Sequence, residues 1–363
     1  MIDFGVLVLV FGVTLFAFLA FQRVYASDLK SDEHVILFTT NAHLIDNGRL
    51  WQADVHGWIF EPEEGSAWRS ALANSFVKRL GLDQSALEES AFRKRAAMFL
   101  VDNERNKRLT IDVAGESTQL AKSGSNGHFF STIRFPADLI DQNCDGCREV
   151  AIVSPAGDER RFAGRVQLIG EDGISVISDI DDTVKTSDVL NKRELIKNTF
   201  LRPFEAVPGM PQAYQRWADQ GAVFHYVSSS PWQLYPFLTE FLDDTGLPGG
   251  SLHLKQFRVK DQSFFDLFAS SMTTKVPTIS RLVKQYPKRR FVLVGDSGEH
   301  DPEVYAEIYR QHPDQVAHIF IRNVTGESAD AARYQATFGA IPAAVWTVFD
   351  DPNDLGNYRL PES

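Results

Sequence analysis

The feature that most constrains the fold is a change of sequence pattern near residue 174. From about 174 to 350, strand-like runs rich in Val, Ile and Phe alternate with amphipathic helical stretches. Alternation of this kind is typical of a parallel sheet covered by helices on both faces. The predicted strands are "ISVIS", "AVFHYVS", "LHLKQF", "RFVLVG" and "VAHIFIRNV". We therefore expect a doubly wound α/β domain, with its chemistry at the carboxyl ends of the strands.

Residues 34 to 173 show a different pattern, in which short runs of Val, Ile, Phe and Thr are separated by Gly, Asn, Asp and Pro. The regular spacing of these runs favours a β-rich, sandwich-like domain. Good helix formers with apolar residues three and four apart predict a helical insert within 66–101. Residues 351–363 are expected to form a C-terminal tail.

The N-terminal segment, residues 1–26, contains an uncharged apolar run from Phe4 to Phe21. Its length favours an uncleaved membrane anchor, whereas the small residues near Ala26 favour a signal peptide. Both readings predict a chain that is exported, periplasmic or anchored to the membrane. Arg23 follows the run and would draw the next residues toward the cytoplasm, so an anchored form facing the cytoplasm stays open.

Two compositional features exclude classes of function. A formal net charge of −11 argues against a nucleic-acid binder, which needs a basic face to neutralise phosphates. The chain has only two cysteines, Cys144 and Cys147 in "NCDGC", too few for a closed zinc site. A local disulfide fits this pair better than a redox motif, which would need a βαβ context.

Carboxylates crowd the end of the first predicted parallel strand, in "VISDIDDTVKTSD". In an extended segment Asp179, Asp181 and Thr183 would project to the same side. Two carboxylates at one site are costly unless a divalent cation or a shared proton relieves their repulsion. The alternative reading is a solvated acidic turn.

Three later stretches add groups of matching chemistry. Ser228 ends the second strand, where a hydroxyl beside backbone N–H groups is suited to phosphate oxygens, although a turn or capping role would also explain it. Lys275 opens a predicted helix and could place an ammonium group near a phosphoryl group. Asp296 ends a third strand beside a glycine. Asp301 precedes a proline and could act as a helix N-cap.

The ordered set DxDxT, strand-end Ser, Lys and GDxxxxD resembles the haloacid dehalogenase superfamily of phosphotransferases. More narrowly, "SDIDDTVKTSDV", "VFHYVSSSPWQLYPFL", "KVPTISRLVKQYPKRRFVLVGDSGEHDPEVY" and "VWTVFDDP" resemble the catalytic domain of actin-patch-associated phosphatidate phosphatases and their bacterial relatives. The resemblance covers about residues 174 to 350. The stretch "VHGWIFEPE" is similar to the accessory domain of bacterial members.

The resemblance implies a Mg²⁺-dependent phosphatidate phosphatase that works through an aspartyl-phosphate intermediate. Asp179 would be the nucleophile, kept ionised by its low intrinsic pKa. Asp181 would serve as general acid and then general base, which we expect to require a raised pKa. Mg²⁺ would be held by Asp179, Asp296 and the main-chain carbonyl of Asp181.

The remaining groups would act on the phosphoryl oxygens. Thr183, Ser228 and Lys275 would stabilise the charge on these oxygens during transfer, and Asp301 would brace Lys275 or the metal ligands. In related phosphatases, a large insertion in one of two places forms a cap domain that closes over small substrates. Neither 184–208 nor 231–274 is long enough for such a cap. We therefore expect an open site able to take a phosphorylated lipid at a membrane surface. "QSFFDLFASS", 262–271, could contact the membrane or pack into the core.

Two other functions stay open. The same chemistry could act on another phosphomonoester, such as a phosphoprotein, a nucleotide or a sugar phosphate. Alternatively, the chain could be a noncatalytic envelope binding module whose α/β part is vestigial.

Overall fold

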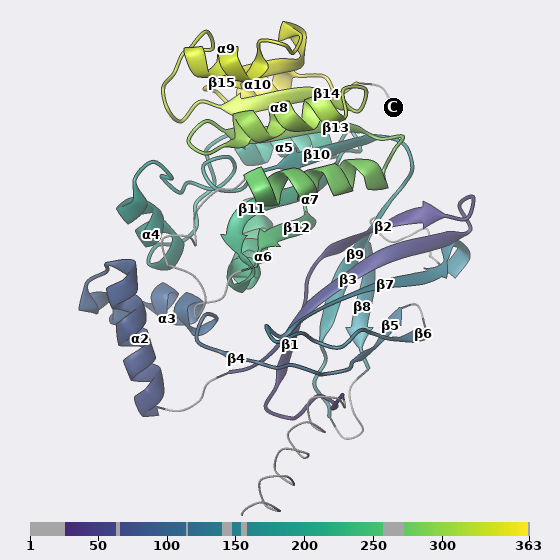
Figure 1. Cartoon of the computed structure of the whole chain (residues 1–363), viewed down its shortest axis with the longest axis vertical. Coiled ribbons are helices and arrows are strands. Elements are labelled where there is room, and N and C mark those ends of the chain that lie inside the picture. Colours follow the sequence, from purple (N-terminus) through teal and green to yellow (C-terminus); the bar gives the residue numbers. More distant parts are fainter. Residues whose placement is uncertain are drawn as a thin grey trace, which may run out of the picture.

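The structure is a computed structural model that describes residues 26–62, 66–113, 115–139, 147–153, 158–256 and 272–361. Most of the predicted N-terminal signal or anchor, the segment 262–271 and Cys144 lie outside these residues. None of the helices within the described ranges has both the length and the apolar composition needed to cross a bilayer. The chain folds into a β-rich part and an α/β part, which lie side by side (Figure 1).

The β-rich part is built on one network of hydrogen-bonded strands. Its strands are β1 (His34–Leu37), β2 (Thr40–Ile45), β3 (Leu50–Glu61), β4 (Asp102–Asn103), β5 (Thr110–Val113), β6 (Glu116–Gln119), β7 (His128–Pro136), β8 (Cys147–Ile152) and β9 (Ala163–Ile169). The order is β1-β3-β2-β9-β8-β5-β6, with β4 and β7 also paired to β3. Hydrogen bonds thus link all nine strands into a single sheet, whereas a sandwich is expected to have two.

A helical segment follows β3, within the residues where the sequence predicts helices. It comprises α2 (Ser66–Leu80), the 3₁₀ helix η1 (Gln84–Glu88) and α3 (Ser90–Ala97). Phe76 and Phe92 are buried and lie within reach of Phe200 in the α/β part, with ring centroids 5.5 and 6.5 Å from it. The helices therefore pack against the α/β part of the chain.

The α/β part has a six-stranded, fully parallel sheet. Its strands are β10 (Ile174–Ser178), β11 (Val223–Pro231), β12 (Gly250–Lys255), β13 (Arg290–Asp296), β14 (Val316–Arg322) and β15 (Trp346–Phe349). They are arranged as β12-β11-β10-β13-β14-β15. The order of the strands therefore reverses between β10 and β13, the position at which doubly wound sheets form their ligand crevice.

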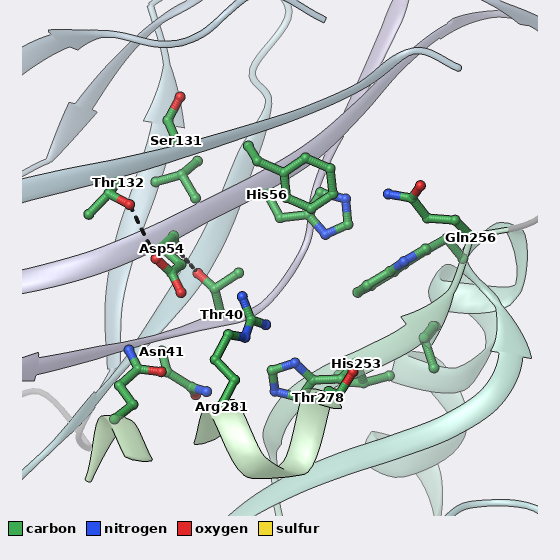
Figure 2. Close-up of a pocket in the computed structure, with 16 residues that line it drawn as sticks. Thr40, Asn41, Asp54, His56, Ser131, Thr132, His253, Gln256, Thr278 and Arg281 are labelled. Carbon is green, nitrogen blue, oxygen red and sulfur yellow. Dashed lines mark hydrogen bonds between the residues drawn. The ribbon is translucent and has the colours of Figure 1, made fainter. Parts of the chain in front are cut away.

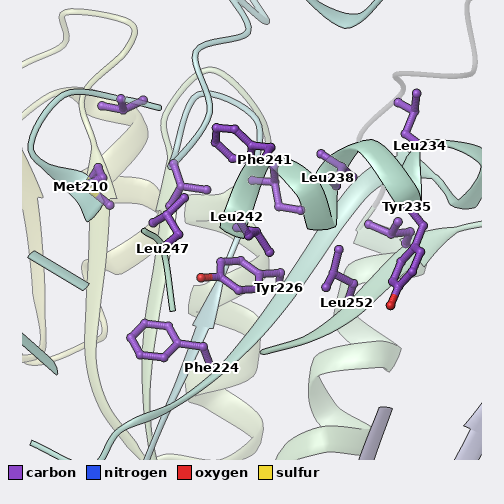
Figure 3. Close-up of a cluster of buried hydrophobic side chains, with 14 of the residues drawn as sticks. Met210, Phe224, Tyr226, Leu234, Tyr235, Leu238, Phe241, Leu242, Leu247 and Leu252 are labelled. Carbon is purple, nitrogen blue, oxygen red and sulfur yellow. The ribbon is translucent and has the colours of Figure 1, made fainter. Parts of the chain in front are cut away.

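Helices cover both faces of this sheet, as the sequence pattern predicts. They are α4 (Lys192–Phe200), α5 (Met210–Ala218), η3 (Trp232–Leu234), α6 (Tyr235–Thr245), α7 (Met272–Gln285), α8 (Asp301–Gln311), α9 (Ala332–Phe338), η5 (Ala343–Val345) and α10 (Asn353–Asn357). Successive strand residues point to opposite faces: Val176 packs with the side chains of α5 and α6, and Ile177 with those of α7 and α8. Figure 3 shows the first of these cores around Tyr226 and Leu242.

Direct contacts fix the two parts of the chain to each other. The backbone N–H of Thr39 donates to the Tyr235 hydroxyl at 2.8 Å. At the end of α7, Gln285 Nε2 lies 2.8 Å from Nδ1 of His43 on β2. The β-rich part is therefore held against α6 and α7.

Residues 353–360, which fall within the predicted C-terminal tail, pack against the α/β part. Leu355 is fully buried, and Leu360 is buried as well. Trp217 on α5 donates from Nε1 to the carbonyl of Tyr358 at 3.3 Å. These residues belong to the core of the α/β part.

Candidate active site

The segment after β10 forms a tight turn. The backbone N–H groups of Val184 and Lys185 both donate to the carbonyl of Ile180, at 3.0 and 2.9 Å. The Asp182 backbone has a positive φ of 51°, and its carboxylate accepts N–H groups from residues 187–189. Asp182 thus fixes the loop, while Asp179 and Asp181, both buried, remain for the site. The simple alternation expected for an extended segment does not describe this turn.

Lys275 is the centre of a buried cluster of charges. Its Nζ lies 2.9 Å from Asp179 Oδ1, 3.1 Å from Glu299 Oε2 and 2.5 Å from Asp301 Oδ1. The side chains of Lys275, Asp179 and Asp301 are almost completely buried. The structure therefore brings together groups from β10, α7 and the start of α8, which are distant in sequence.

Three carboxylates of this cluster could hold a divalent cation. One ligand atom from each of Asp179, Asp296 and Glu299 lies within 4.8 Å of the other two. Among the described residues, the buried Oδ2 atoms of Asp179 and Asp296 have no hydrogen-bond partner. Buried carboxylate oxygens are costly to leave unpaired, and a hard cation such as Mg²⁺ takes oxygen ligands. The donor set therefore fits a divalent metal.

The carboxylates are also short of positive charge. Burial, followed by repulsion from Asp301 and Glu299, raises the pKa of Asp296 well above its usual value. Burial likewise raises the pKa of Asp179, against the opposing effect of Lys275. Burial among other acids therefore opposes the ionised state that the intrinsic acidity of Asp179 predicts. A bound cation would favour the ionised forms.

Asp181 lies in a different environment. Its Oδ1 is 2.8 Å from Lys185 Nζ and accepts the Ser187 hydroxyl at 2.6 Å, and its Oδ2 accepts the Ser230 hydroxyl at 2.8 Å. Burial alone would raise the pKa of Asp181, but Lys185 and these hydroxyls lower it to about 2. The prediction of a raised pKa for Asp181 is therefore wrong for this arrangement, because the ion pair with Lys185 favours the ionised carboxylate.

The serines at the end of β11 face the same region. The Ser228 hydroxyl lies 3.3 Å from Asp181 Oδ2 and also accepts the Ser230 N–H at 3.0 Å. The buried hydroxyls of Ser229 and Thr183 have no partner among the described residues. Thr183 directly follows the acidic run, and an unpartnered hydroxyl there can donate to a phosphoryl oxygen.

Gly295 lets α8 approach the end of β13. A Cβ atom at this position would lie 2.4 Å from Asp301 Oδ2 and 2.7 Å from Tyr305 Cε2. The same Asp301 oxygen accepts the Asp296 N–H at 3.3 Å. The prediction that Asp301 is an N-cap is wrong, because His300 is the N-cap of α8 and Asp301 is its first residue. Asp301 instead contacts Lys275 and the Asp296 backbone.

Sequence reasoning missed several residues of the site. Glu299 stands between the two predicted acids of "GDSGEHD", and Lys185 follows the acidic run in "DDTVKTSD". Nothing in the spacing of Glu299 indicates that the turn after β13 brings its carboxylate within 3.1 Å of Lys275 Nζ. Lys185 stands four residues after Asp181, and only the tight turn brings them together.

The helical segment also reaches the neighbourhood of the site. Arg95 on α3 donates to the carbonyls of Thr199 and Arg202 at 2.8 and 2.7 Å. Its guanidinium lies 3.8 Å from the ring centroid of Phe204, and Lys185 Nζ lies 4.9 Å from the same centroid. A chain of contacts therefore connects α3 to the lysine that pairs with Asp181.

Comparison with known proteins finds relatives that are similar to the α/β part. Residues 174–323 match the family described as the catalytic domain of phosphatidate phosphatase APP1. Phosphatidate phosphatase APP1 of Saccharomyces cerevisiae is 36% identical over 162 residues, which cover 44% of this chain and 27% of the yeast protein. An uncharacterized protein of Schizosaccharomyces pombe is 29% identical over 228 residues, or 61% and 37% of the two chains. The chain thus spans well under half the length of these relatives.

Among solved structures, a D,D-heptose 1,7-bisphosphate phosphatase from B. bronchiseptica, complexed with magnesium and phosphate, is 14% identical. It aligns over 51% of this chain and 96% of its own, with a TM-score of 0.31, which is too low to establish a shared fold. The family match and the yeast relative confirm the resemblance predicted from the sequence motifs.

Proposed function

We propose that the chain is a Mg²⁺-dependent phosphatidate phosphatase, which releases diacylglycerol and inorganic phosphate. The observation that carries the proposal is the pair of unpartnered, buried Oδ2 atoms on Asp179 and Asp296, beside the Lys275 ammonium. The match of residues 174–323 to a phosphatidate phosphatase catalytic domain supports the reaction class and the substrate.

Asp179 acts as the nucleophile. One of its carboxylate oxygens attacks phosphorus, the bond from phosphorus to the lipid oxygen breaks, and an aspartyl-phosphate forms. Asp179, Asp296 and Glu299 would hold Mg²⁺, whose charge neutralises the carboxylates and the phosphoryl oxygens. Lys275 holds Asp179 in place through the 2.9 Å contact. The unpartnered Thr183 hydroxyl and the Ser228 hydroxyl, which contacts Asp181, would bind the phosphoryl oxygens.

Asp181 moves the protons. It protonates the departing lipid alkoxide and then takes a proton from the water that attacks the aspartyl-phosphate. Because Lys185 and Ser230 keep the pKa of Asp181 near 2, the ionised form needed for the second step is already present. The first step needs a protonated Asp181, so we infer that substrate binding loosens its contacts with Lys185 and Ser230.

The N-terminal segment and the β-rich part would locate and support the catalytic part. We propose that residues 1–26 direct the chain to export or anchor it, which would bring the site to a membrane that carries the lipid. We also propose that the β-rich part with its helical insert is an accessory domain that supports the catalytic one. The contact of Thr39 with Tyr235 and the packing of Phe76 on Phe200 support this role.

A substrate panel tests the proposal. Phosphate release would be measured from phosphatidate in mixed micelles and from soluble phosphomonoesters, namely a phosphopeptide, a nucleotide and a sugar phosphate. We expect turnover of phosphatidate that requires Mg²⁺ and disappears in Asp179→Asn. Faster turnover of a soluble ester would replace the lipid with that substrate. Absence of any turnover would favour a noncatalytic binding module.

A further inference from the structure

A second pocket lies between the two parts of the chain, away from the acid cluster. It has a volume of about 430 Å³, in the size range of small-molecule sites. Strands β2, β3 and β7 of the β-rich part form one wall, and η3, β12 and α7 form the other. Figure 2 shows Arg281 reaching from α7 toward Asp54 and His56 on the opposite wall.

In the wall formed by β2, β3 and β7, the side-chain oxygen of Asn41 has no hydrogen-bond partner among the described residues. Asn41 is only 4% exposed, and this Oδ1 atom is buried. Its Nδ2 makes a long contact of 3.3 Å with His225 Nδ1. A buried amide oxygen of this kind costs free energy unless a donor reaches it. The pocket therefore offers a hydrogen-bond acceptor to a ligand that carries N–H or O–H groups.

The charges in the pocket indicate a neutral ligand. The Arg281 guanidinium is exposed and has no ion-pair partner within the part of the chain that the structure describes. The half-buried carboxylate of Asp54, which accepts Thr132 Oγ1 at 3.4 Å, lies on the wall that faces Arg281 and would repel an anion. Burial lowers the pKa of His253 to about 3, and Arg281 adds to this effect, so this imidazole is neutral.

Each wall of the pocket also contributes an aromatic ring, Phe130 from β7 and Trp232 from η3. Phe130 is 54% exposed, and its ring stacks on His56 with centroids 4.0 Å apart. Trp232 meets His56 edge to face at 4.5 Å and also lines the pocket. The negative face of an aromatic ring attracts weakly positive C–H groups. Aromatic rings together with hydrogen-bonding groups are suited to a molecule that has both C–H faces and hydroxyls.

We propose that this pocket binds a neutral sugar, as a pyranose ring, whose hydroxyls contact Arg281 and Asp54 and whose C–H face contacts the rings of Phe130 and Trp232. A sugar hydroxyl donates and accepts at the same time. It can donate to Asn41 Oδ1 or to Asp54 while it accepts from Arg281. The C–H face of the pyranose lies against the rings of Phe130 and Trp232. The site is separate from the phosphatase centre and does not depend on the activity proposed for it.

Titration calorimetry on the full chain in detergent tests the proposal. The probes are D-glucose, D-galactose and N-acetyl-D-glucosamine, with inorganic phosphate as the anionic comparison. We expect saturable binding of at least one pyranose. Arg281→Gln and Asp54→Asn, which keep the shapes of the side chains approximately, should each weaken binding about tenfold, as expected when one charge-assisted hydrogen bond is lost.

Lys284→Gln is the matched control, because Lys284 is exposed on the same helix and does not line the pocket. It should leave the dissociation constant within about twofold. The proposal is overturned if none of the sugars binds saturably, if Arg281→Gln and Asp54→Asn bind as well as the unaltered chain, or if phosphate binds more tightly than every sugar. Because the readout is binding, loss of phosphatase activity would not affect the result.

Discussion

Asp179 and Asp296 lie at the carboxyl ends of neighbouring parallel strands, and each has a buried Oδ2 atom without a hydrogen-bond partner among the described residues. The two strands flank the point where the strand order reverses. The backbone thus brings two like charges together, and Glu299 adds a third carboxylate. Lys275 supplies one positive charge to these carboxylates, and a divalent cation would balance the remaining negative charge.

Replacement of Lys275 by Met should destabilise the fold. Without its ammonium, the carboxylates of Asp179 and Asp301 would be buried without the cation that they contact at 2.9 and 2.5 Å. Breaking a buried ion pair in this way costs roughly 3–5 kcal/mol. Urea unfolding in the presence of a chelator measures the change. Lys284→Met on the exposed face of α7 is the control, and an equal loss in both variants would contradict the role of Lys275.

Substitution of Gly295 by Ala should disturb the junction of β13 and α8. The new methyl group would lie 2.4 Å from Asp301 Oδ2, so α8 would have to shift. Overpacking of this kind costs about 1–3 kcal/mol. Thermal unfolding measures the loss, and Gly249→Ala, where nothing lies within 4 Å of the added Cβ, should be nearly neutral. Equal melting temperatures for the two variants would show that α8 does not pack closely here.

Arg95→Ala should lower turnover more than substrate affinity. Arg95 supports the ring of Phe204, which lies beneath Lys185, and Lys185 positions Asp181. We expect kcat to fall by about tenfold with KM within twofold, because an error in the position of the acid/base group affects the chemical step. Arg95→Lys should restore part of the loss. Lys94→Ala, exposed on the same helix, is the control.

If KM rises while kcat is unchanged in Arg95→Ala, the effect is on binding and the positioning role is wrong. The same conclusion follows if Lys94→Ala and Arg95→Ala behave alike.

The stability of the fold should decrease below about pH 6.5, the usual pKa of histidine. Burial lowers the pKa of fully buried His225 well below that value, so His225 stays neutral in the folded chain. The unfolded chain takes up the proton, and stability is therefore lost as the pH falls. This group contributes a slope of up to about 1.4 kcal/mol per pH unit. Urea unfolding from pH 7.5 to 5 would show a shallower slope in His225→Asn than in the unaltered chain, and equal slopes would contradict the role of His225.

Much of the α/β part could be predicted from the sequence, because its signals are local. Apolar runs buried on both sides give the strands, and helices of 3.6-residue period separate them. The acids at the ends of β10 and β13 meet because the carboxyl ends of parallel strands lie on one edge of the sheet. Asp179, Lys275 and Asp296 could therefore be proposed as one site before the structure was known.

The parts that were missed depend on contacts between distant residues. Lys185 pairs with Asp181 only because the turn after β10 closes tightly, and nothing in the spacing shows this. In the β-rich part, strand runs were visible, but β3 pairs with four other strands, and such pairing has no local sequence signal. Arg95 looked like an ordinary helical arginine because its partners lie about a hundred residues away.

The most direct test of the central claim is a Mg²⁺ titration of phosphate release from phosphatidate in mixed micelles, after treatment of the enzyme with EDTA. If Asp179 and Asp296 share a divalent cation, the treated enzyme should be inactive and Mg²⁺ should restore its activity. Asp296→Asn should then need at least about tenfold more Mg²⁺ for half-maximal rate, and Asp179→Asn should stay inactive at any concentration. Full activity after EDTA treatment, or turnover by Asp179→Asn, would contradict the account.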